Sequence, residues 1–339
     1  MKRPERILLG HGSGGRLTQE LVKESFLPAF GNPFLAALSD SAILPELPPG
    51  RPALTTDAFV VDPPIFPGGD LGYLSVCGTV NDLSVAGARP LWLTWALILE
   101  EGAPGELVET CAQGAARAAK EAGVAIVAGD TKVVPLGKGD QIYAVTAGLG
   151  VVPPGRETGD HRVKPGDALI VSGPLGDHGA TIMGCRHELS GQGLQSDCAP
   201  LASLCEAAFE SGADIHAMHD PTRGGATVTC HEVAARAGVR IVLEEPALPV
   251  RPEVRAVCDL LGLDPLSSPC EGRVLIWVDA GDAERLLAAL RAHPFGREAA
   301  RIGHVEVMRE GWSPVSLTTV SGSERPLDLL SGAGLPRIC

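Results

Sequence analysis

The sequence contains no long uninterrupted run of apolar residues. None of its segments approaches the roughly 18 apolar residues that a membrane-spanning helix needs. The N-terminal stretch MKRPERILLGHGSGG carries basic side chains but only a very short apolar run, so it lacks the hydrophobic region of a signal peptide. We therefore predict a cytoplasmic protein with no membrane contact.

Basic residues are also scarce. The chain has 28 Lys and Arg residues against 41 Asp and Glu residues, for a formal net charge of -13. A nucleic-acid backbone is bound by clustered Lys and Arg, so we expect no nucleic-acid partner. The excess of acidic residues does not exclude nucleotide binding, because a metal ion bridges carboxylates to phosphates.

No CxxC pair occurs among the nine cysteines, and nothing in their spacing resembles a structural zinc site. In a reducing compartment most cysteines are small buried hydrophobes. This reading fits the five that lie in apolar, helix-like stretches, namely Cys77, Cys111, Cys205, Cys230 and Cys258.

Strand-like and helix-like segments alternate along the chain, and 339 residues suggest two domains. In the first half we predict strands at 53–61, 91–100, 124–134 and 141–152 and a helix at 105–123. In the second half we predict strands at 168–173, 239–245, 273–279 and 300–307 and helices near 177–188, 200–211, 222–238, 252–262 and 282–293. The polar, Gly- and Pro-rich segment 153–167 marks the boundary, so the predicted parts are 1–152, 153–320 and a tail at 321–339.

A glycine-rich loop, GHGSGG, precedes a helical pattern near the N-terminus. Its residues Gly12, Ser13, Gly14 and Gly15 can direct backbone N–H groups at an anion, beside the positive end of the following helix. No GK[ST] follows, so the loop is not a Walker A sequence, and a flexible N-terminal loop is the alternative.

Five aspartates lie in short polar breaks between apolar segments: Asp40, Asp57, Asp82, Asp130 and Asp220. Ligands collect at such breaks in α/β folds, and Mg²⁺ takes carboxylate and phosphate oxygens. Together they favour magnesium–nucleotide binding, although any single one also suits a helix cap or a turn.

Three further residues bear on chemistry. Lys132 follows an acidic loop and suits a phosphate, with a solvated edge lysine as the alternative. Arg223 lies in DPTRGG, directly before a helix. Glu271, in CEGR, is either exposed at the start of a strand or held for acid–base work.

Several strings, in order and over almost the whole chain, resemble the HypE family of hydrogenase maturation proteins: HGSGG, TTDAFVVDPPIFPGGDLG, CGTVNDLSVAGA, AGDTKVV, SGPLGDHGAT, DPTRGG, CEG and the terminal PRIC. The resemblance implies an α+β fold with two α/β domains of the aminoimidazole ribonucleotide synthetase type. It further implies a homodimer that pairs strands of the N-terminal domains, ATP near the dimer interface and a flexible C-terminal tail. The chain departs from the family pattern at Pro221 and Cys270, and both changes leave the neighbouring acidic residue in place.

The resemblance also implies a reaction. A carbamoyltransferase, HypF, carbamoylates the C-terminal cysteine, and ATP drives dehydration of that S-carbamoyl group to a thiocyanate. The cyanide then passes to an iron held by a HypC–HypD complex, which builds the nickel–iron centre of hydrogenase. The alternatives are an ATP-dependent synthetase of the same fold acting on a free small molecule, and a non-catalytic scaffold that presents a thiol.

On this resemblance, each candidate residue acquires an expected role. Cys339 carries the substrate, Glu271 is the base and Lys132 stabilises the transferred phosphoryl group. Magnesium is assigned to Asp57, Asp82 and Asp220. ATP is assigned to Gly12, Ser13, Gly14, Gly15, Asp40, Asn81, Gly129, Asp130, Thr131 and Arg223, with Asn81 orienting the substrate amide or a metal-bound water.

The tail must bring its own last residue to ATP. Nine residues, 331–339, reach roughly 30 Å when fully extended. We expect Leu335 and Ile338 to dock the tail and Pro336 to stiffen it. The adjacent carboxylate raises the pKa of the Cys339 thiol and Arg337 lowers it, and the sequence leaves the balance open.

Overall fold

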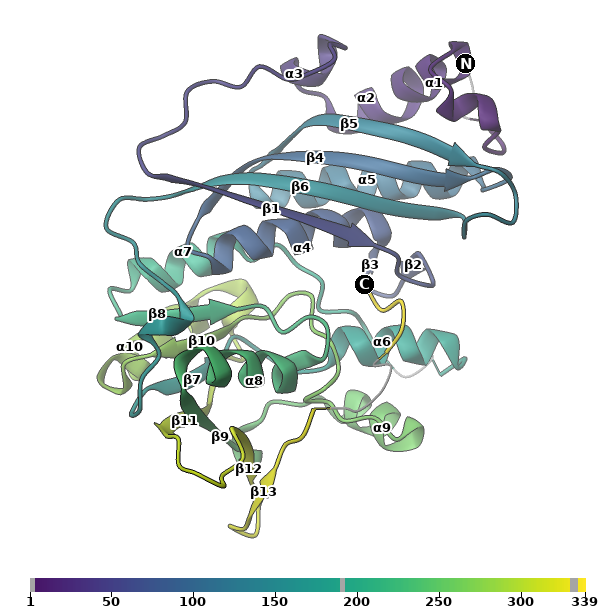
Figure 1. Ribbon diagram of the computed structural model, residues 1–339. Coiled ribbons are helices and arrows are strands. Elements are labelled where there is room, and N and C mark those ends of the chain that lie inside the picture. Colours follow the sequence, from purple (N-terminus) through teal and green to yellow (C-terminus); the bar gives the residue numbers. More distant parts are fainter. Residues whose placement is uncertain (1–3, 190–192, 330–334) are drawn as a thin grey trace.

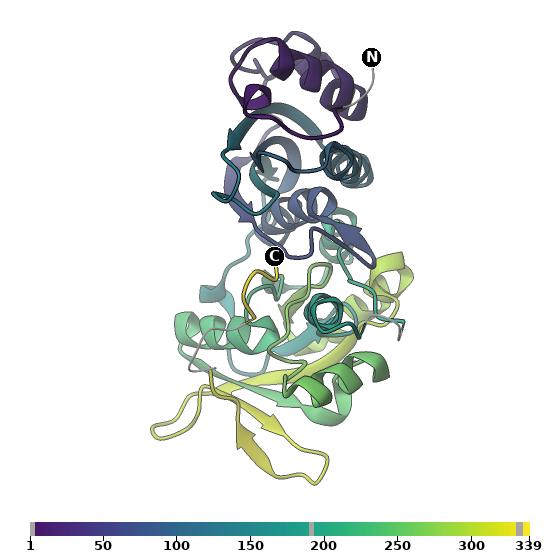
Figure 2. The ribbon, with the colours of Figure 1, turned by 90° about the vertical axis from the view of Figure 1, so that its right-hand side faces the viewer.

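The computed structural model describes residues 4–189, 193–329 and 335–339, and two main sheets with their helices make up most of it (Figure 1). Figure 2 shows the two layered domains stacked on one another, with the C-terminus lying between them. This arrangement confirms the predicted pair of α/β domains. The predicted boundary at residue 153 stays a prediction, and residues 330–334 of the predicted tail lie outside the described residues.

The first sheet has the strand order β1-β6-β4-β5. Its strands are β1 (Arg51–Phe59), β4 (Arg89–Glu100), β5 (Ala125–Val134) and β6 (Ile142–Val152). Strand β6 is antiparallel to both neighbours, whereas β4 and β5 are parallel. Inward and outward residues alternate along β1 and β6, which is the pattern of a sheet covered on one face. A small hairpin, β2 (Ile65–Phe66) with β3 (Gly69–Asp70), follows β1.

Two helices, α4 (Leu71–Val85) and α5 (Gly105–Ala122), cover one face of this sheet (Figure 1). Asp70 caps α4 by accepting a hydrogen bond from the Tyr73 N–H at 2.9 Å. The two helices approach so closely that a Cβ on Gly72 would lie 1.7 Å from the Cys111 carbonyl oxygen. Every residue of α4 except Asp82 is buried. The helix is therefore fixed rigidly, and Asp82 is its one side chain with access to solvent.

Short helical segments precede β1 and pack beside α5 against β5 (Figure 1). They are η1 (Leu9–Gly12), α1 (Arg16–Leu21), a π-helical turn (Val22–Phe26), α2 (Leu27–Phe30) and α3 (Pro33–Ala36). The rings of Phe26 and Phe30 meet Trp95 of β4 edge-on, with centroid distances of 6.0 and 5.3 Å. Aromatic contacts therefore anchor the N-terminal segment to the sheet.

The second sheet has the order β13-β12-β9-β11-β7-β10-β8 and is antiparallel except between β9 and β12. Its strands are β7 (Ala168–Val171), β8 (Ile215–His219), β9 (Val239–Glu244), β10 (Leu275–Val278), β11 (Ala300–Val307), β12 (Val315–Thr318) and β13 (Glu324–Pro326). The helices are α6 (Asp177–Arg186), α7 (Ala202–Glu210), α8 (Gly225–Ala237), α9 (Pro252–Leu261) and α10 (Ala283–Ala292). One core joins α8 to the sheet, and a second joins α7 and α10 to it.

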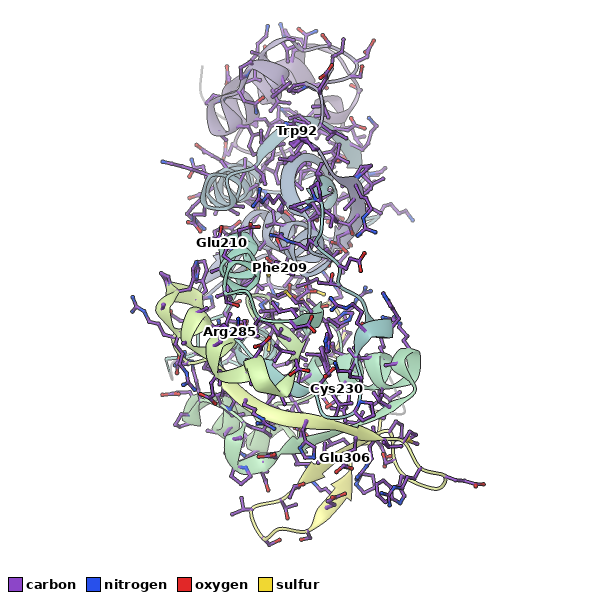
Figure 3. All side chains as sticks on the ribbon, turned by 90° about the vertical axis from the view of Figure 1, so that its left-hand side faces the viewer. Trp92, Phe209, Glu210, Cys230, Arg285 and Glu306 are labelled. Atoms are coloured by element: carbon purple, nitrogen blue, oxygen red, sulfur yellow. The ribbon has the colours of Figure 1, made fainter. Side chains whose placement is uncertain are left out.

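Charged groups tie the domains together on the side away from the C-terminus. Glu206 of α7 accepts hydrogen bonds from Arg89 of β4, at 2.5 Å, and from Arg156, at 2.9 Å. The Arg156 guanidinium also lies 4.0 Å from the ring centroid of Phe209, which Figure 3 labels on α7. These contacts attach α7 to the first sheet.

Most predicted ranges match an observed element within a few residues, and the five cysteines expected in helices are all buried. Helix α4 was expected only as a helix-like stretch around Cys77 and was given no bounds, because a helix buried on all sides shows no amphipathic period. The short strands β8 and β12 were also not predicted. Within the described residues, no helix combines the length and apolar character required to cross a membrane.

Candidate functional site

A cavity of about 450 Å³ lies between the two domains, and the last residue of the chain is in its wall. Four separate parts of the sequence contribute: β1 and the segment after it, α4, the 220–223 and 271 segments of the second domain, and the C-terminus. The residues relevant to chemistry are Asp57, Asp82, Asp220, Arg223, Glu271 and Cys339. Six of the predicted site residues therefore meet at one place.

The first domain contributes two carboxylates. Alternation along β1 directs Thr55 and Asp57 toward α4, where Asp82 is exposed to the cavity. The Thr55 hydroxyl donates to Asp82 at 2.8 Å, and the Thr79 hydroxyl donates to Asp57 at 3.3 Å. Neither carboxylate has a basic partner among these contacts.

Asp220 follows the last residue of β8, and the chain then turns sharply into α8. Gly224 and Gly225 have φ angles of +78° and +60°, and a Cβ on Gly225 would lie 2.5 Å from the Leu266 carbonyl oxygen. Only glycine suits that combination of backbone angle and close contact. The paired glycines of DPTRGG therefore bring Arg223 to the wall of the cavity.

Glu271 is buried, with 2% of its surface exposed, so the reading of this residue as an exposed loop residue is wrong. Its N–H and that of Gly272 donate to Asp197 at 3.1 and 3.2 Å, which fixes the backbone. Its Oε1 atom has no hydrogen-bond partner. A buried carboxyl oxygen with no partner is costly, and its position in the cavity wall leaves it free for a ligand.

Burial and mutual repulsion raise the pKa values of these acids. The pKa of Asp82 is raised to about 7, first by burial and then by Asp220 and Asp57. The pKa of Asp220 is raised to about 6, mainly by burial. Burial and the neighbouring carboxylates also hold the pKa of Glu271 well above its ordinary value. The cluster therefore favours a bound proton or cation.

The donor set suits magnesium held jointly with phosphates. In the described part of the chain, no three His, Cys, Asp or Glu side chains are close enough to hold a metal ion by themselves. Mg²⁺ usually keeps several waters and binds one or two carboxylates together with substrate phosphates, rather than a closed protein cage. Three underneutralised aspartates around an open cavity fit that requirement.

Cys339 lies in the cavity because its tail is docked there. Ile338 is 2% exposed, and Leu335 and Cys339 pack against the same core, so the predicted docking of Leu335 and Ile338 is confirmed. Burial, followed by the charge of Glu271, raises the pKa of the Cys339 thiol to about 12. The docked thiol is therefore protonated at neutral pH.

The cation that lowers the pKa of Cys339 is Arg223, not Arg337 as the sequence suggested. The Arg337 guanidinium instead forms an ion pair with Asp140 and donates to the Val60 carbonyl oxygen at 3.1 Å. Adjacency in the sequence did not decide this contact, because the Arg337 guanidinium is held by Asp140 and by the Val60 carbonyl oxygen.

Apart from Asn81, the remaining predicted residues lie at the opposite edge of the first sheet. Lys132 and Asp130 lie exposed on β5 and form an ion pair of 2.7 Å, which lowers the pKa of Asp130. A second pocket of about 250 Å³ includes Asp40, Gly129, Asp130 and Thr131 in its wall. The glycine-rich loop packs here too, since a Cβ on Gly12 would lie 2.4 Å from the Val133 nitrogen.

The two clusters are separated within one chain. Strands β1 and β5 are the two edges of a four-stranded sheet, so about 14 Å of sheet width lies between them. The structure thus does not bring Lys132, Asp40 or the residues Gly12, Ser13, Gly14 and Gly15 to the cavity that holds Cys339.

Asn81 does not have the role expected from the sequence. Its amide nitrogen donates to the carbonyl oxygens of Ala199 and Glu271, at 3.1 and 3.2 Å. Its amide oxygen accepts from the Leu201 N–H at 2.7 Å. Because all of these contacts are to the second domain's backbone, the geometry supports a residue that positions Glu271, not one that orients a substrate amide.

Asp197 was not identified from the sequence, although it holds the backbone of Glu271 and Gly272. It lies in a polar loop, where aspartate is a common turn residue, so its type and setting carry no specific signal. The same holds for Thr55, whose contact with Asp82 depends on β1 lying against α4.

Comparison with known families matches the chain in two parts. Residues 39–152 match the N-terminal domain of AIR synthase related proteins, and residues 164–311 match their C-terminal domain. Together these matches include β1 to β6, β7 to β11 and all the helices of both domains from α4 onward.

Individual proteins match over nearly the full length. The carbamoyl dehydratase HypE of Rhodobacter capsulatus is 46% identical over 342 residues, which cover 99% of each chain. A crystal structure of the hydrogenase maturation protein HypE in complex with ATP is 42% identical, with a TM-score of 0.93 over 98% of this chain and 99% of the other. HypE in a HypE–HypF complex is 42% identical, with a TM-score of 0.79 over 93% of this chain and 100% of the other.

The crowded carboxylates predict an unusual effect of Asp82→Asn on stability. The pKa of Asp82 is about 7 in the folded protein, above its value in the unfolded chain. The contribution of this side chain to the stability of the fold is therefore fully present below pH 4 and is lost as the pH rises through 7. With a chelator present, we expect the variant to exceed the wild type by about 1–3 kcal/mol at pH 8 and to match it at pH 4. Urea unfolding at both pH values measures this difference.

The matched control is Asp130→Asn, whose carboxylate has a lowered pKa beside Lys132 and should give no gain at pH 8. If Asp82→Asn is no more stable than the wild type at pH 8, the account of repulsion in the cavity is wrong.

Proposed function

Because the chain belongs to the HypE family of carbamoyl dehydratases, we propose that it dehydrates an S-carbamoyl group on its own Cys339 to a thiocyanate, using ATP. One observation carries the proposal. The terminal cysteine lies in a cavity together with three underneutralised aspartates and a buried glutamate whose Oε1 has no hydrogen-bond partner. The thiol of the tail, the candidate magnesium ligands and the candidate base therefore line one cavity.

The chemistry removes one oxygen and two protons from S–C(=O)–NH₂ to leave S–C≡N. Because hydroxide is a poor leaving group, the carbonyl oxygen first bonds to the γ-phosphorus of ATP, and ADP leaves. The nitrogen then loses its protons, the C–O bond breaks and inorganic phosphate departs with the oxygen. The protein must align the thiocarbamate with ATP, balance phosphate charge and accept a proton.

Glu271 is our candidate for the group that accepts the proton from nitrogen. It is buried, its Oε1 is unpartnered and the charge of its carboxylate acts directly on Cys339. A base with a raised pKa suits removal of an amide proton, since its proton affinity is greater than that of an exposed glutamate. Asn81 and Asp197 hold its backbone in place.

Magnesium would be held by Asp57, Asp82 and Asp220 with ATP phosphates, and Arg223 would meet a phosphate as a further cation. Bound Mg²⁺ would neutralise the acidic cluster, which lowers the pKa of Glu271 and makes its carboxylate available as a base. Relatives support the nucleotide, since a HypE with a TM-score of 0.93 to this chain is known in complex with ATP.

Carbamoylation itself requires the tail to leave the cavity. A thiolate is the reactive form of cysteine, and the docked Cys339 is both covered and held as a thiol by its raised pKa of about 12. The tail would therefore alternate between an outward pose, in which a partner modifies it, and the inward pose of this structure.

We propose HypF as the partner that carbamoylates the tail, because a relative of similar structure is known as a HypE–HypF complex. The HypC–HypD complex would then receive the cyanide for the iron of nickel–iron hydrogenase. A cytoplasmic location is part of the same proposal.

We further propose that a homodimer completes the site. The face of the first sheet that α4 and α5 leave open carries exposed apolar side chains, including Leu54 at 77% and Ile98 at 36% exposure. Such a face suits pairing with a second copy. Pairing would bring Lys132 and the glycine-rich loop of one chain toward the Cys339 cavity of the other, which one chain alone keeps apart.

Two other functions remain testable. A synthetase acting on a free small molecule would not need Cys339, and a scaffold that presents a thiol would not need ATP. The docking of Cys339 beside Glu271 favours the dehydratase over both.

Cys339→Ala should abolish modification of the tail and leave ATP binding intact. The variant is incubated with the carbamoyltransferase, carbamoyl phosphate and ATP, and cleavage after Glu324 then releases residues 325–339, in which Cys339 is the one cysteine. Mass spectrometry of this peptide should show no added group. The control Cys185→Ala removes another partly exposed thiol and should give the wild-type product. Full-size modification of the Cys339→Ala peptide would disprove the proposal.

Glu271→Gln should accumulate the carbamoylated tail. Loss of a general base slows proton transfer by about 100-fold or more, so the thiocyanate should form at under about 1% of the wild-type rate. The same peptide mass, followed over time, separates the two products. Glu253→Gln, on the exposed first turn of α9, is the control. Conversion at the normal rate would rule out Glu271 as the base.

The composite site predicts that two inactive variants complement each other. Lys132→Ala and Glu271→Gln are co-expressed with different tags, and the mixed dimer is isolated. It should show about half of the wild-type turnover per dimer, because one of its two symmetric sites is intact. If the two residues serve the same site from one chain, the mixed dimer will be as inactive as either parent.

A further inference from the structure

The docked tail is bound through its main chain. The carbonyl oxygens of Pro336 and Arg337 accept from the guanidinium of Arg186, at 2.7 and 2.5 Å. The Ile338 carbonyl oxygen lies 2.8 Å from His178 Nε2. The terminal Cys339 oxygen accepts from the Val60 N–H at 3.1 Å. In each of the last four residues, the carbonyl oxygen therefore accepts a hydrogen bond from a donor in another part of the protein.

Arg186 connects three pieces of chain at one point. It is the last residue of α6, and its Nε donates to the Asp62 carbonyl oxygen at 2.7 Å while the other two nitrogens hold the tail. The Asp62 N–H also donates to the Arg337 carbonyl oxygen, at 3.2 Å. The planar guanidinium, with its fixed fork of donors, thus holds the tail against the segment that follows β1.

His178 binds the tail from the first turn of the same helix. The imidazole is fully buried, and the ring of Phe66 packs edge-on against it with a centroid distance of 5.4 Å. A carbonyl oxygen only accepts, so Nε2 carries the proton that meets Ile338, and Nδ1 accepts from the Ser196 hydroxyl at 2.8 Å. The surroundings therefore fix one neutral tautomer aimed at the tail.

These contacts set the register of the tail. They fall on four consecutive residues and place Ile338 in the core, so a slip of one residue would expose Ile338 and move Cys339 out of position. Arg337 adopts the left-handed φ of +52°, a conformation that a non-glycine residue keeps only when its neighbours enforce it. The donors on α6 and at residues 60–62 supply that restraint.

We propose that Arg186 and His178 form a latch that captures the C-terminal tail by its backbone carbonyls and holds Cys339 in the interdomain cavity. Both are positioning residues, since neither is in the cavity wall with the carboxylates. The latch itself does not depend on the reaction. Its effect on turnover rests on the proposed function.

The first test measures protection of Cys339 from iodoacetamide. In Arg186→Ala the tail loses its charged donors, and we expect the alkylation rate of Cys339 to rise about tenfold or more. The peptide 325–339 reports this thiol alone. Arg186→Lys should restore part of the protection, because an ammonium donates to carbonyls without the fork. His178→Leu, which retains bulk but not the donor, should also raise the rate.

Arg285→Ala is the matched control, since this arginine lies on α10 and pairs with Asp282 (Figure 3). It should leave the rate unchanged. Wild-type protection in both Arg186→Ala and His178→Leu would overturn the latch. Should Arg186→Ala fail to fold, judged by its thermal transition, His178→Leu decides the question by the same measurement.

The second test uses the carbamoylated protein and ATP. The latch predicts that Arg186→Ala lowers kcat for thiocyanate formation about tenfold with an unchanged KM for ATP, because the nucleotide groups are intact and the tail is not held. An unchanged kcat alongside faster alkylation would overturn the positioning role in turnover. If no variant and no wild type forms thiocyanate, the proposed function fails, while the alkylation rates still decide whether the latch exists.

Discussion

Carboxylates that are crowded into a partly buried cavity are the constraint on which the rest of the site depends. Asp57 and Asp82 come from the first domain and Asp220 and Glu271 from the second. Burial and the charges of neighbouring carboxylates raise the pKa values of Asp82, Asp220 and Glu271. Leaving such charges without cations costs stability in the free protein. The cavity therefore favours a ligand that brings positive charge. In the proposed function, a magnesium–nucleotide complex would supply this charge together with the phosphates.

Polar side chains from both domains hold this cluster of carboxylates in place. Helix α4 is buried except at Asp82, and its Asn81 ties the first domain to the backbone around Glu271. Asp197 binds the same backbone from the other side. Because the Asn81 contacts cross between the domains, the distance between the aspartates of the first domain and the glutamate depends on how the two sheets are docked.

The C-terminal tail is bound in a different way from the carboxylate cluster. It is held by hydrogen bonds to its carbonyl groups and by one buried isoleucine, which together define its register. Under the proposed function, backbone recognition of this kind suits a segment that is also presented to a partner protein. The side chains that add to the docking are Ile338 and Leu335, which pack against the core, and Arg337, which forms an ion pair with Asp140.

Much of the architecture was predictable, because most strands and helices have clear local periodicity and are separated by polar breaks. Helix α4 was expected only as a helix-like stretch around Cys77, without bounds, since burial on all sides removes that periodicity. Glu271 shows the same limit for the site. As one acidic residue at the start of a strand, it was equally consistent with exposure. In the structure it is buried, and Asn81 and Asp197 hold its backbone through contacts between distant parts of the chain.

The sequence by itself determined the chemical inventory: a terminal thiol, aspartates at the ends of strands and helices, a glycine turn before α8 and too little positive charge to match them. These are properties of residue type and of local pattern, which short segments of chain already contain. The tertiary structure alone decided that six of the candidates meet in one cavity while Lys132 and the glycine-rich loop lie at the far edge of the sheet. It also decided that Arg223, not the neighbouring Arg337, acts on Cys339. Burial and the distance between charges depend on contacts between distant parts of the chain, and those contacts exist only once the two sheets and the tail have packed together.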